Sequence, residues 1–307
     1  ARDSRWSWER DSSRVPITFA AASLQPRLVI MKRWIARILA SLVLIILLLA
    51  GGACAMIGYM SVPRDIPGVA RDTLRIDQAR VMSYLHAGDA SAQRIIFVHG
   101  SPGMATDWSR YLTKPQPGLE SIAIDRFGFG ATQPDAPVSS LHEQARAIEP
   151  FLVERNGKWP ILVGHSLGGT IVCQAAVDYP QKVGGLVILA AALSPELEKI
   201  HWYQSVADLR MISAILPSVL TACNRELLPL KGELEKLAEH LGEIECPVVV
   251  IHGTKDALVP VGNVDYLREK LQKDALMDVL VLPAENHFLP WTIEPIIRKK
   301  IAELGVR

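Results

Sequence analysis

The sequence predicts an α/β protein, in which a mostly parallel sheet is covered by helices on both faces. Downstream of residue 70, apolar runs of strand length alternate with helix-length segments, which is the pattern of a parallel sheet. The runs are continuously apolar rather than alternating, as expected of strands that are buried on both faces. One run, residues 161–165, leads directly into a glycine-flanked serine and a helix-competent segment.

Length, charge and cysteine usage narrow the function classes. A chain of 307 residues that is 49% hydrophobic can form one large domain and an accessory segment. Its formal net charge of +1 gives no electrostatic basis for binding nucleic acid. The cysteines show no CxxC spacing, so we expect free thiols and no metal site. They are Cys54, Cys173, Cys223 and Cys246.

The first 30 residues are polar, rich in arginine and without periodicity, and we expect residues 1–30 to be disordered. Met31 is followed at once by Lys32, Arg33 and a long apolar run. One hypothesis is therefore that Met31 is the translation start and that residues 1–30 are not native.

Residues 31–63 have the composition of a membrane anchor or a signal segment. No residue from Ile38 to Pro63 is charged, which is long enough for a helix to cross a hydrocarbon layer of about 30 Å. Lys32, Arg33 and Arg37 precede this run, so the positive-inside rule predicts that the rest of the chain lies on the non-cytoplasmic side. The alternative is a signal peptide cleaved near Ala53–Ala55, which would give a secreted or periplasmic protein. Apolarity continues past that point, which favours the anchor.

The remaining chain, residues 64–307, reads as one domain with a helical insertion at about 194–245. The insertion lacks a convincing strand and has the size of a lid over a site at the carboxyl ends of the strands. The predicted strands are 73–76, 80–86, 94–98, 121–124, 161–165, 186–190, 247–251 and 277–282. The predicted helices are 141–154, 170–178, 203–216, 233–241, 261–272 and 294–304.

Ser166 is the candidate nucleophile. It lies in Gly164-His165-Ser166-Leu167-Gly168, between a predicted strand and a predicted helix. A serine held at such a sharp turn has a strained backbone and needs neighbours without bulk, which Gly164 and Gly168 provide. The Leu167 amide then lies at a helix N-terminus, where it can stabilise developing negative charge.

The chain resembles the α/β-hydrolase fold family over roughly residues 74–304. Two motifs carry the resemblance: the loop His99-Gly100-Ser101-Pro102-Gly103, and the Gly-His-Ser-Leu-Gly-Gly sequence of residues 164–169. Together with the small helical cap, they resemble the serine hydrolase and esterase branch of the family. By this resemblance, the backbone amide of Ser101 is the second oxyanion-hole donor beside Leu167.

The family order of nucleophile, acid and base directs the search downstream of Ser166. His287 follows the last predicted strand, where a base would meet the serine, and is the predicted base. Asp256, in the loop after the preceding strand, is the predicted acid, which would hold the imidazole in the required tautomer. We expect His252 to pack in the core. His201 and His240 fall in the cap, with a surface role expected.

These residues predict a serine hydrolase that cleaves a small-molecule carboxylic ester through an acyl-enzyme, with no metal and no organic cofactor. Lactonase, thioesterase, aminopeptidase and carbon–carbon bond hydrolase activities use the same triad and remain open. A non-catalytic ligand-binding protein of this fold is a further alternative. Arg126 or Phe127 could face the substrate, and residues 201–203 could line an acyl pocket.

Overall fold

The computed structural model describes residues 24–272 and 275–305, and the chain divides into two units, residues 1–53 and 54–307. Helix α1 spans Leu24–Met60. Its stretch Val29–Met60 is long and apolar enough to cross a membrane, and its most apolar 18-residue window is not buried. Most of the segment expected to be disordered, residues 1–23, lies outside the described residues.

The helix begins earlier than the sequence analysis expects. Residues 24–30, assigned there to the disordered segment, belong to α1. Leu28, Val29 and Ile30 extend the apolar run in the N-terminal direction. Pro26 lies in the first turn, where its missing N–H removes no intrahelical hydrogen bond.

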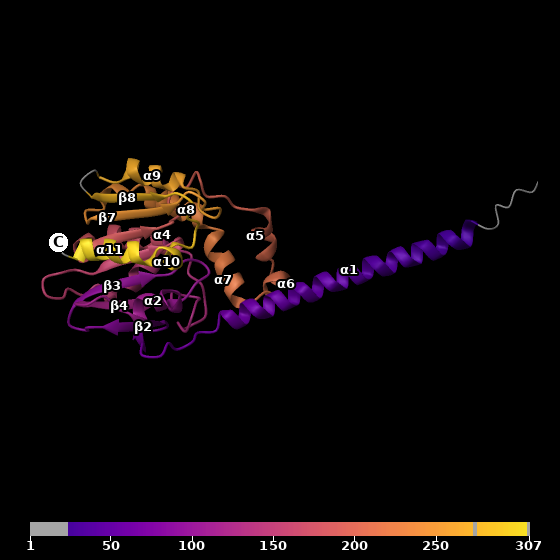
Figure 1. Ribbon diagram of the computed structural model, residues 1–307, viewed down its shortest axis with the longest axis horizontal. Helices are drawn as coiled ribbons and strands as arrows, with labels where there is room; N and C mark the ends of the chain where they lie inside the picture. Colours follow the sequence, from indigo (N-terminus) through magenta and orange to yellow (C-terminus); the bar gives the residue numbers. More distant parts are fainter. Residues whose placement is uncertain (1–23, 273–274, 306–307) are drawn as a thin grey trace, which may run out of the picture. The chain divides into compact units, whose positions relative to one another are not determined.

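Residues 54–307 contain one eight-stranded sheet in the order β1-β2-β4-β3-β5-β6-β7-β8 (Figure 1). The pairs β1–β2 and β2–β4 are antiparallel and all the others are parallel, so the predicted mostly parallel sheet is confirmed. The strands are β1 (Ala70–Arg75), β2 (Val81–Gly88), β3 (Gln93–Val98), β4 (Leu119–Ile124), β5 (Ile161–His165), β6 (Gly185–Leu189), β7 (Val248–Gly253) and β8 (Leu276–Leu282).

Helices cover both faces of this sheet. Successive side chains of a strand point to opposite faces, so each central strand contributes to two hydrophobic cores. Ile96 and Val98 of β3 pack in a core with α3, α4, α8 and α9, whereas Ile95 and Phe97 pack with α2, α10 and α11. These helices are α2 (Ser109–Thr113), α3 (Leu141–Ile148), α4 (Leu167–Asp178), α8 (Leu230–Ala238), α9 (Gly262–Lys270), α10 (Leu289–Thr292) and α11 (Glu294–Gly305).

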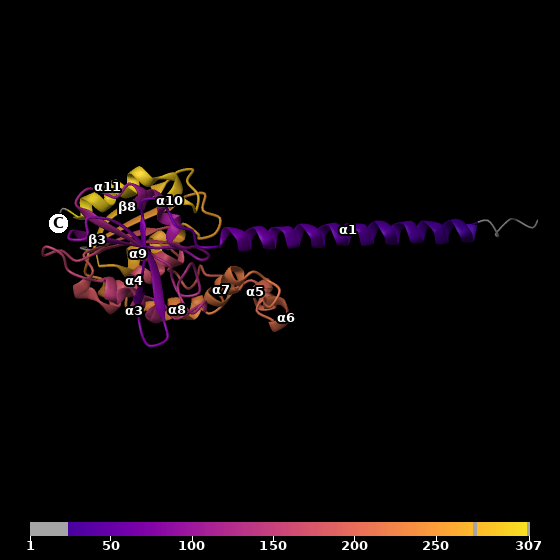
Figure 2. The same ribbon diagram turned by 90° about the horizontal axis from the view of Figure 1, so that it is seen from below.

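The insertion between β6 and β7 is helical, and its first helices differ from the expected ones. Its first three helices are α5 (Trp202–Ala207), α6 (Arg210–Ser213) and α7 (Ser218–Leu227), and α8 completes it (Figure 2). The single helix expected over 203–216 is therefore two short helices, interrupted at Asp208 and Leu209. Helix α7 was not predicted. The helix expected over 141–154 ends as an α-helix at Ile148, just before Pro150.

Candidate active site

Ser166 lies at the turn between β5 and α4, at the carboxyl end of the sheet. Its backbone has φ 53° and ψ −125°, a conformation that costs energy for a residue with a side chain. A Cβ on Gly164 would overlap the carbonyl oxygen of Gly168, and one on Gly168 would overlap that of Val98. The two glycines are thus required by close backbone approach, as the sequence predicts.

Two backbone amides flank this serine. A Cβ on Gly100 would lie 3.0 Å from the Ser166 Cβ, so the loop carrying Ser101 packs directly against the serine. Among the residues that the structure describes, neither the Ser101 nor the Leu167 amide donates a hydrogen bond to a protein acceptor. Unpaired N–H groups beside a serine can donate to a developing oxyanion.

His287 and Asp256 form a direct pair. The Nδ1 of His287 donates to Oδ2 of Asp256 at 2.7 Å, and both side chains are buried. A carboxylate can only accept, so the neutral imidazole adopts the tautomer with its proton on Nδ1, and its Nε2 is the nitrogen that can accept a proton. Asp256 Oδ1 accepts from the amides of Leu258 and Val259 at 2.9 and 2.8 Å.

The Asp256 carboxyl remains ionised. Burial by itself raises its pKa, but hydrogen bonds from His252, His287 and the Val259 amide outweigh burial and hold the pKa well below its usual value. A permanent negative charge is what stabilises an imidazolium during catalysis.

His287 is also linked to His165, the residue before Ser166. His165 Nε2 donates to the His287 carbonyl oxygen at 2.8 Å, and the two rings are 4.8 Å apart between centroids. Burial, and then the nearby His287, lower the pKa of His165 to about 4, which keeps it neutral. No hydrogen bond joins Ser166 to His287 within the described residues, and such bonds are commonly long in the absence of substrate.

Two residues support the site in ways that the sequence reasoning missed. His252 was expected to pack in the core, and it is buried. Its Nε2 also donates to the Val259 carbonyl at 3.0 Å and lies 3.4 Å from Asp256 Oδ2, so it holds the acid loop as well. The signal was its position four residues before the acid. Asn263 Oδ1 accepts from the Leu193 amide, which fixes the start of the insertion.

Two further expectations concern the surroundings of Ser166. Arg126 and Phe127 are completely buried, so neither faces a substrate. Trp202 and Tyr203 are 79% and 53% exposed, and residues 201–203 line neither of the two described pockets.

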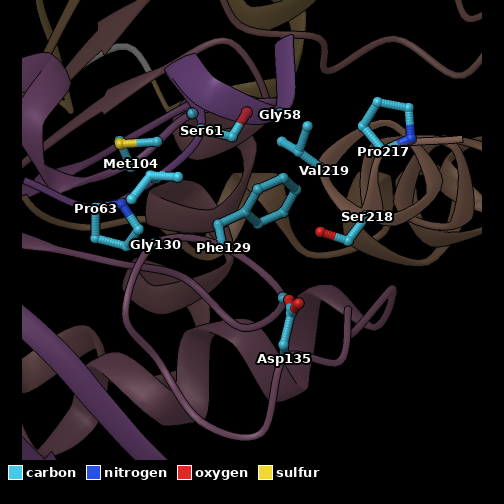
Figure 3. Close-up of a pocket in the computed structure, with 13 residues that line it drawn as sticks. Gly58, Ser61, Pro63, Met104, Phe129, Gly130, Asp135, Pro217, Ser218 and Val219 are labelled. Carbon is cyan, nitrogen blue, oxygen red and sulfur yellow. The ribbon is translucent and has the colours of Figure 1, made fainter. Parts of the chain in front are cut away.

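One of these pockets has a volume of about 260 Å³ and lies next to the loop that carries Ser101 (Figure 3). Gly103 and Met104 of that loop line it, together with Phe129 and with Ser218 and Val219 of α7. Neither Ser166 nor His287 lines it, so it adjoins the oxyanion loop without containing the candidate triad. The described residues contain no group of three His, Cys, Asp or Glu side chains arranged to hold a metal ion.

Comparison with known proteins identifies the fold. Residues 93–212 match the family model described as the alpha/beta hydrolase fold. With the sheet order and the turn at Ser166 between β5 and α4, this match shows that the chain has the α/β-hydrolase fold.

The curated relatives are distant. A dihydrolipoyllysine-residue acetyltransferase component of an acetoin cleaving system from Cupriavidus necator is 23% identical over 62% of this chain and 58% of its own length. The chain thus spans little more than half of that relative. A 2-hydroxy-6-oxononadienedioate/2-hydroxy-6-oxononatrienedioate hydrolase from Cupriavidus pinatubonensis is 24% identical, over 57% of this chain and 75% of its own length.

Solved structures share the fold. A bacterial membrane phospholipase A has a TM-score of 0.58 and 18% identity, with 88% of this chain and 97% of that chain covered. An epoxide hydrolase from Vigna radiata has a TM-score of 0.60 and 17% identity, with 78% and 98% covered. These likenesses support the α/β-hydrolase fold of the chain.

Proposed function

We propose that the protein is a serine hydrolase that cleaves a carboxylic ester through an acyl-enzyme. Ser166 Oγ attacks the ester carbonyl while His287 Nε2 takes its proton, and the amides of Ser101 and Leu167 stabilise the resulting oxyanion. His287 then returns the proton to the leaving alkoxide. Water, activated by the same imidazole, hydrolyses the acyl-enzyme, and Asp256 stabilises the imidazolium in both halves.

One observation carries this proposal. His287 and Asp256 form a buried pair, and the His287 carbonyl accepts a hydrogen bond from His165. His165 directly precedes Ser166, whose backbone conformation is strained. A purely structural turn has no need for an ionised, buried carboxylate that accepts a hydrogen bond from a histidine.

An ester is the substrate that this machinery serves most directly, and similarity to a membrane phospholipase A supports it. A second candidate is hydrolysis of a carbon–carbon bond next to a ketone, favoured by the relative named as a 2-hydroxy-6-oxononadienedioate hydrolase. A serine nucleophile at the turn between β5 and α4 suits both reactions. Lactones, thioesters and peptides are further substrates for the same groups.

We also propose that α1 anchors the enzyme in a membrane with the catalytic unit on the non-cytoplasmic side. The exposed apolar stretch Val29–Met60 supports this, and Lys32 and Arg33 at its N-terminal end set the orientation. Extraction of membranes with alkaline carbonate should leave the protein in the pellet, and protease added outside spheroplasts should digest the catalytic unit. A mature protein whose mass begins near residue 56 would instead establish signal cleavage.

Labelling of the full-length protein in detergent with a fluorophosphonate probe tests the catalytic proposal. We expect wild-type protein and a Ser213→Ala control to be labelled, and Ser166→Ala to remain unlabelled while folded. Folded wild-type protein that takes no label would refute the proposal and favour a non-catalytic binding protein. A panel of p-nitrophenyl esters of increasing acyl length, assayed beside a vinylogous 1,5-diketone, then separates the two substrate classes.

A further inference from the structure

A completely buried ion pair joins the insertion to the core. Arg126 follows β4, and Glu226 lies in α7 of the insertion. The guanidinium binds the carboxylate through both ends, with Nη1–Oε1 at 2.6 Å and Nη2–Oε2 at 3.1 Å, and each side chain is only 1% exposed. Burying two charges costs so much desolvation energy that such a pair adds little net stability, which points to another role.

The arginine side of the pair holds the loop that precedes Ser101. Arg126 Nε donates to the His99 carbonyl at 3.0 Å, and Nη2 donates to the Gly100 carbonyl at 2.9 Å. Its backbone N–H donates to His99 Nε2 at 3.0 Å, while His99 Nδ1 donates to the Gly100 carbonyl at 2.8 Å. The peptide group that contains the Ser101 amide and the peptide group before it are therefore both held by Arg126.

The glutamate side holds Ser101 itself. The Ser101 hydroxyl donates to Glu226 Oε2 at 2.7 Å, and Gln144 Nε2 donates to Oε1 at 2.9 Å. Ser101 is thus held through its side chain by the insertion and through the preceding carbonyls by Arg126. Its amide cannot reorient without breaking contacts on one of these sides.

We propose that Arg126 and Glu226 are positioning residues that aim the Ser101 amide at the developing oxyanion and make this alignment depend on docking of α7. The proposal rests on the ester hydrolase function proposed above, since it concerns the same oxyanion hole. If α7 leaves the core, the guanidinium and the Ser101 hydroxyl both lose their buried acceptor. Only a docked insertion therefore presents the complete site.

Such a role should appear in the chemical step. An oxyanion donor contributes mainly to the transition state, so its misalignment lowers kcat more than it raises KM. A pair that only supports the fold would lower the melting temperature without changing kcat at temperatures far below melting.

The chain offers a matched control pair at the opposite end of the same two strands. Arg94 of β3 binds Glu120 of β4, with Nε–Oε2 at 2.7 Å and side chains 15% and 7% exposed. Arg94 also donates to a backbone carbonyl, that of Phe151. Both pairs are largely buried and backbone-linked, but only the Arg126 pair touches the oxyanion loop.

Steady-state hydrolysis of p-nitrophenyl acetate, together with thermal unfolding, tests the proposal on the full-length protein. We expect Glu226→Gln to lower kcat by about 10- to 100-fold, as small displacements of catalytic groups do, and KM to change by less than about threefold. Glu120→Gln should lower the melting temperature comparably while kcat stays within about twofold of wild type. Equal kcat values in the two variants would overturn the proposal.

A second variant decides the question if Glu226→Gln does not fold. Ser101→Ala keeps the amide and removes only the hydroxyl that Glu226 holds, so we expect a loss of about tenfold in kcat at an unchanged melting temperature. A wild-type kcat in Ser101→Ala would overturn the proposal. Failure of the proposed function is distinguishable, because then wild-type protein itself would show neither turnover nor Ser166-dependent labelling.

Discussion

The two ends of the parallel strands differ in what they bury. At the carboxyl ends, the chain buries the imidazoles of His99 and His165 and the carboxylate of Asp256, and strains the backbone of Ser166. At the amino ends, the ion pairs of the described residues range from the largely buried Arg94–Glu120 to Lys300–Asp278 at 2.7 Å, in which Asp278 is 37% exposed. The strained serine and the buried imidazoles are thus concentrated at the carboxyl end, as expected where a site, and not the core, determines the sequence.

The largest contrast should appear in catalysis. Asp256→Asn keeps the shape of the acid but removes the charge and favours the wrong imidazole tautomer, so we expect kcat to fall by about 10⁴-fold. Asp278→Asn, at the amino end of β8, should leave kcat within about twofold. Initial rates of ester hydrolysis check both variants. A loss below tenfold in Asp256→Asn would show that another group supports His287.

The carboxyl end was also the more predictable end, for a physical reason. The turn at Ser166 can be recognised in the sequence because only glycine tolerates the backbone contacts at positions 164 and 168. The central strands are buried along almost their whole length and therefore mostly apolar, which made them easy to find. The partly exposed β1 and β2 were also found, and strand boundaries differ from the expected ones by a few residues. The positions of His287 and Asp256 followed from the loops after two such strands.

The insertion was less predictable, because its helices are short and its partner contacts are distant in the sequence. A glutamate inside an amphipathic helix such as α7 normally faces solvent. Glu226 instead meets Arg126, one hundred positions away, and no local pattern encodes such a pair. The same holds for the interruption at Asp208 and Leu209, which replaces the expected continuous helix.

The next contrast is in folding stability, between a glycine at a crowded backbone position, Gly164, and one with more room, Gly185. Gly164→Ala would drive a Cβ into the Gly168 carbonyl, and we expect it to reduce the free energy of unfolding by about 3 kcal/mol. Gly185 begins β6 at the other end of the sheet. There a Cβ meets the flexible side chain of Leu304 at 3.3 Å, so Gly185→Ala should change stability by less than about 1 kcal/mol. Urea unfolding measures both, and equal losses would contradict the contrast.

A smaller effect is expected in how the free energy of unfolding depends on pH. Because burial lowers the pKa of His165 to about 4, from 6.5, the unfolded chain binds a proton there that the folded chain does not. Stability from this group is complete above pH 6.5 and is lost as the pH falls towards 4. At pH 5 the loss is about 2 kcal/mol. His165→Gln should therefore lose less stability than wild type between pH 7 and pH 5, as urea unfolding at both values would show. Parallel losses would contradict this.

The smallest predicted effect is on stability as well, has the opposite pH dependence and concerns Asp107, which follows the loop that carries Ser101. Burial, reinforced by Asp125, raises the pKa of Asp107 to about 6 from 3.8, although the Met104 amide acts against this. Stability from this group is therefore complete below pH 3.8 and is lost as the pH rises through 6. Asp107→Asn should gain stability over wild type by about 1 kcal/mol more at pH 7 than at pH 5. Since His165 and Asp107 offset each other, the wild-type stability should vary less between these pH values than either variant alone reveals. A gain that is equal at both pH values would place the Asp107 titration outside this window.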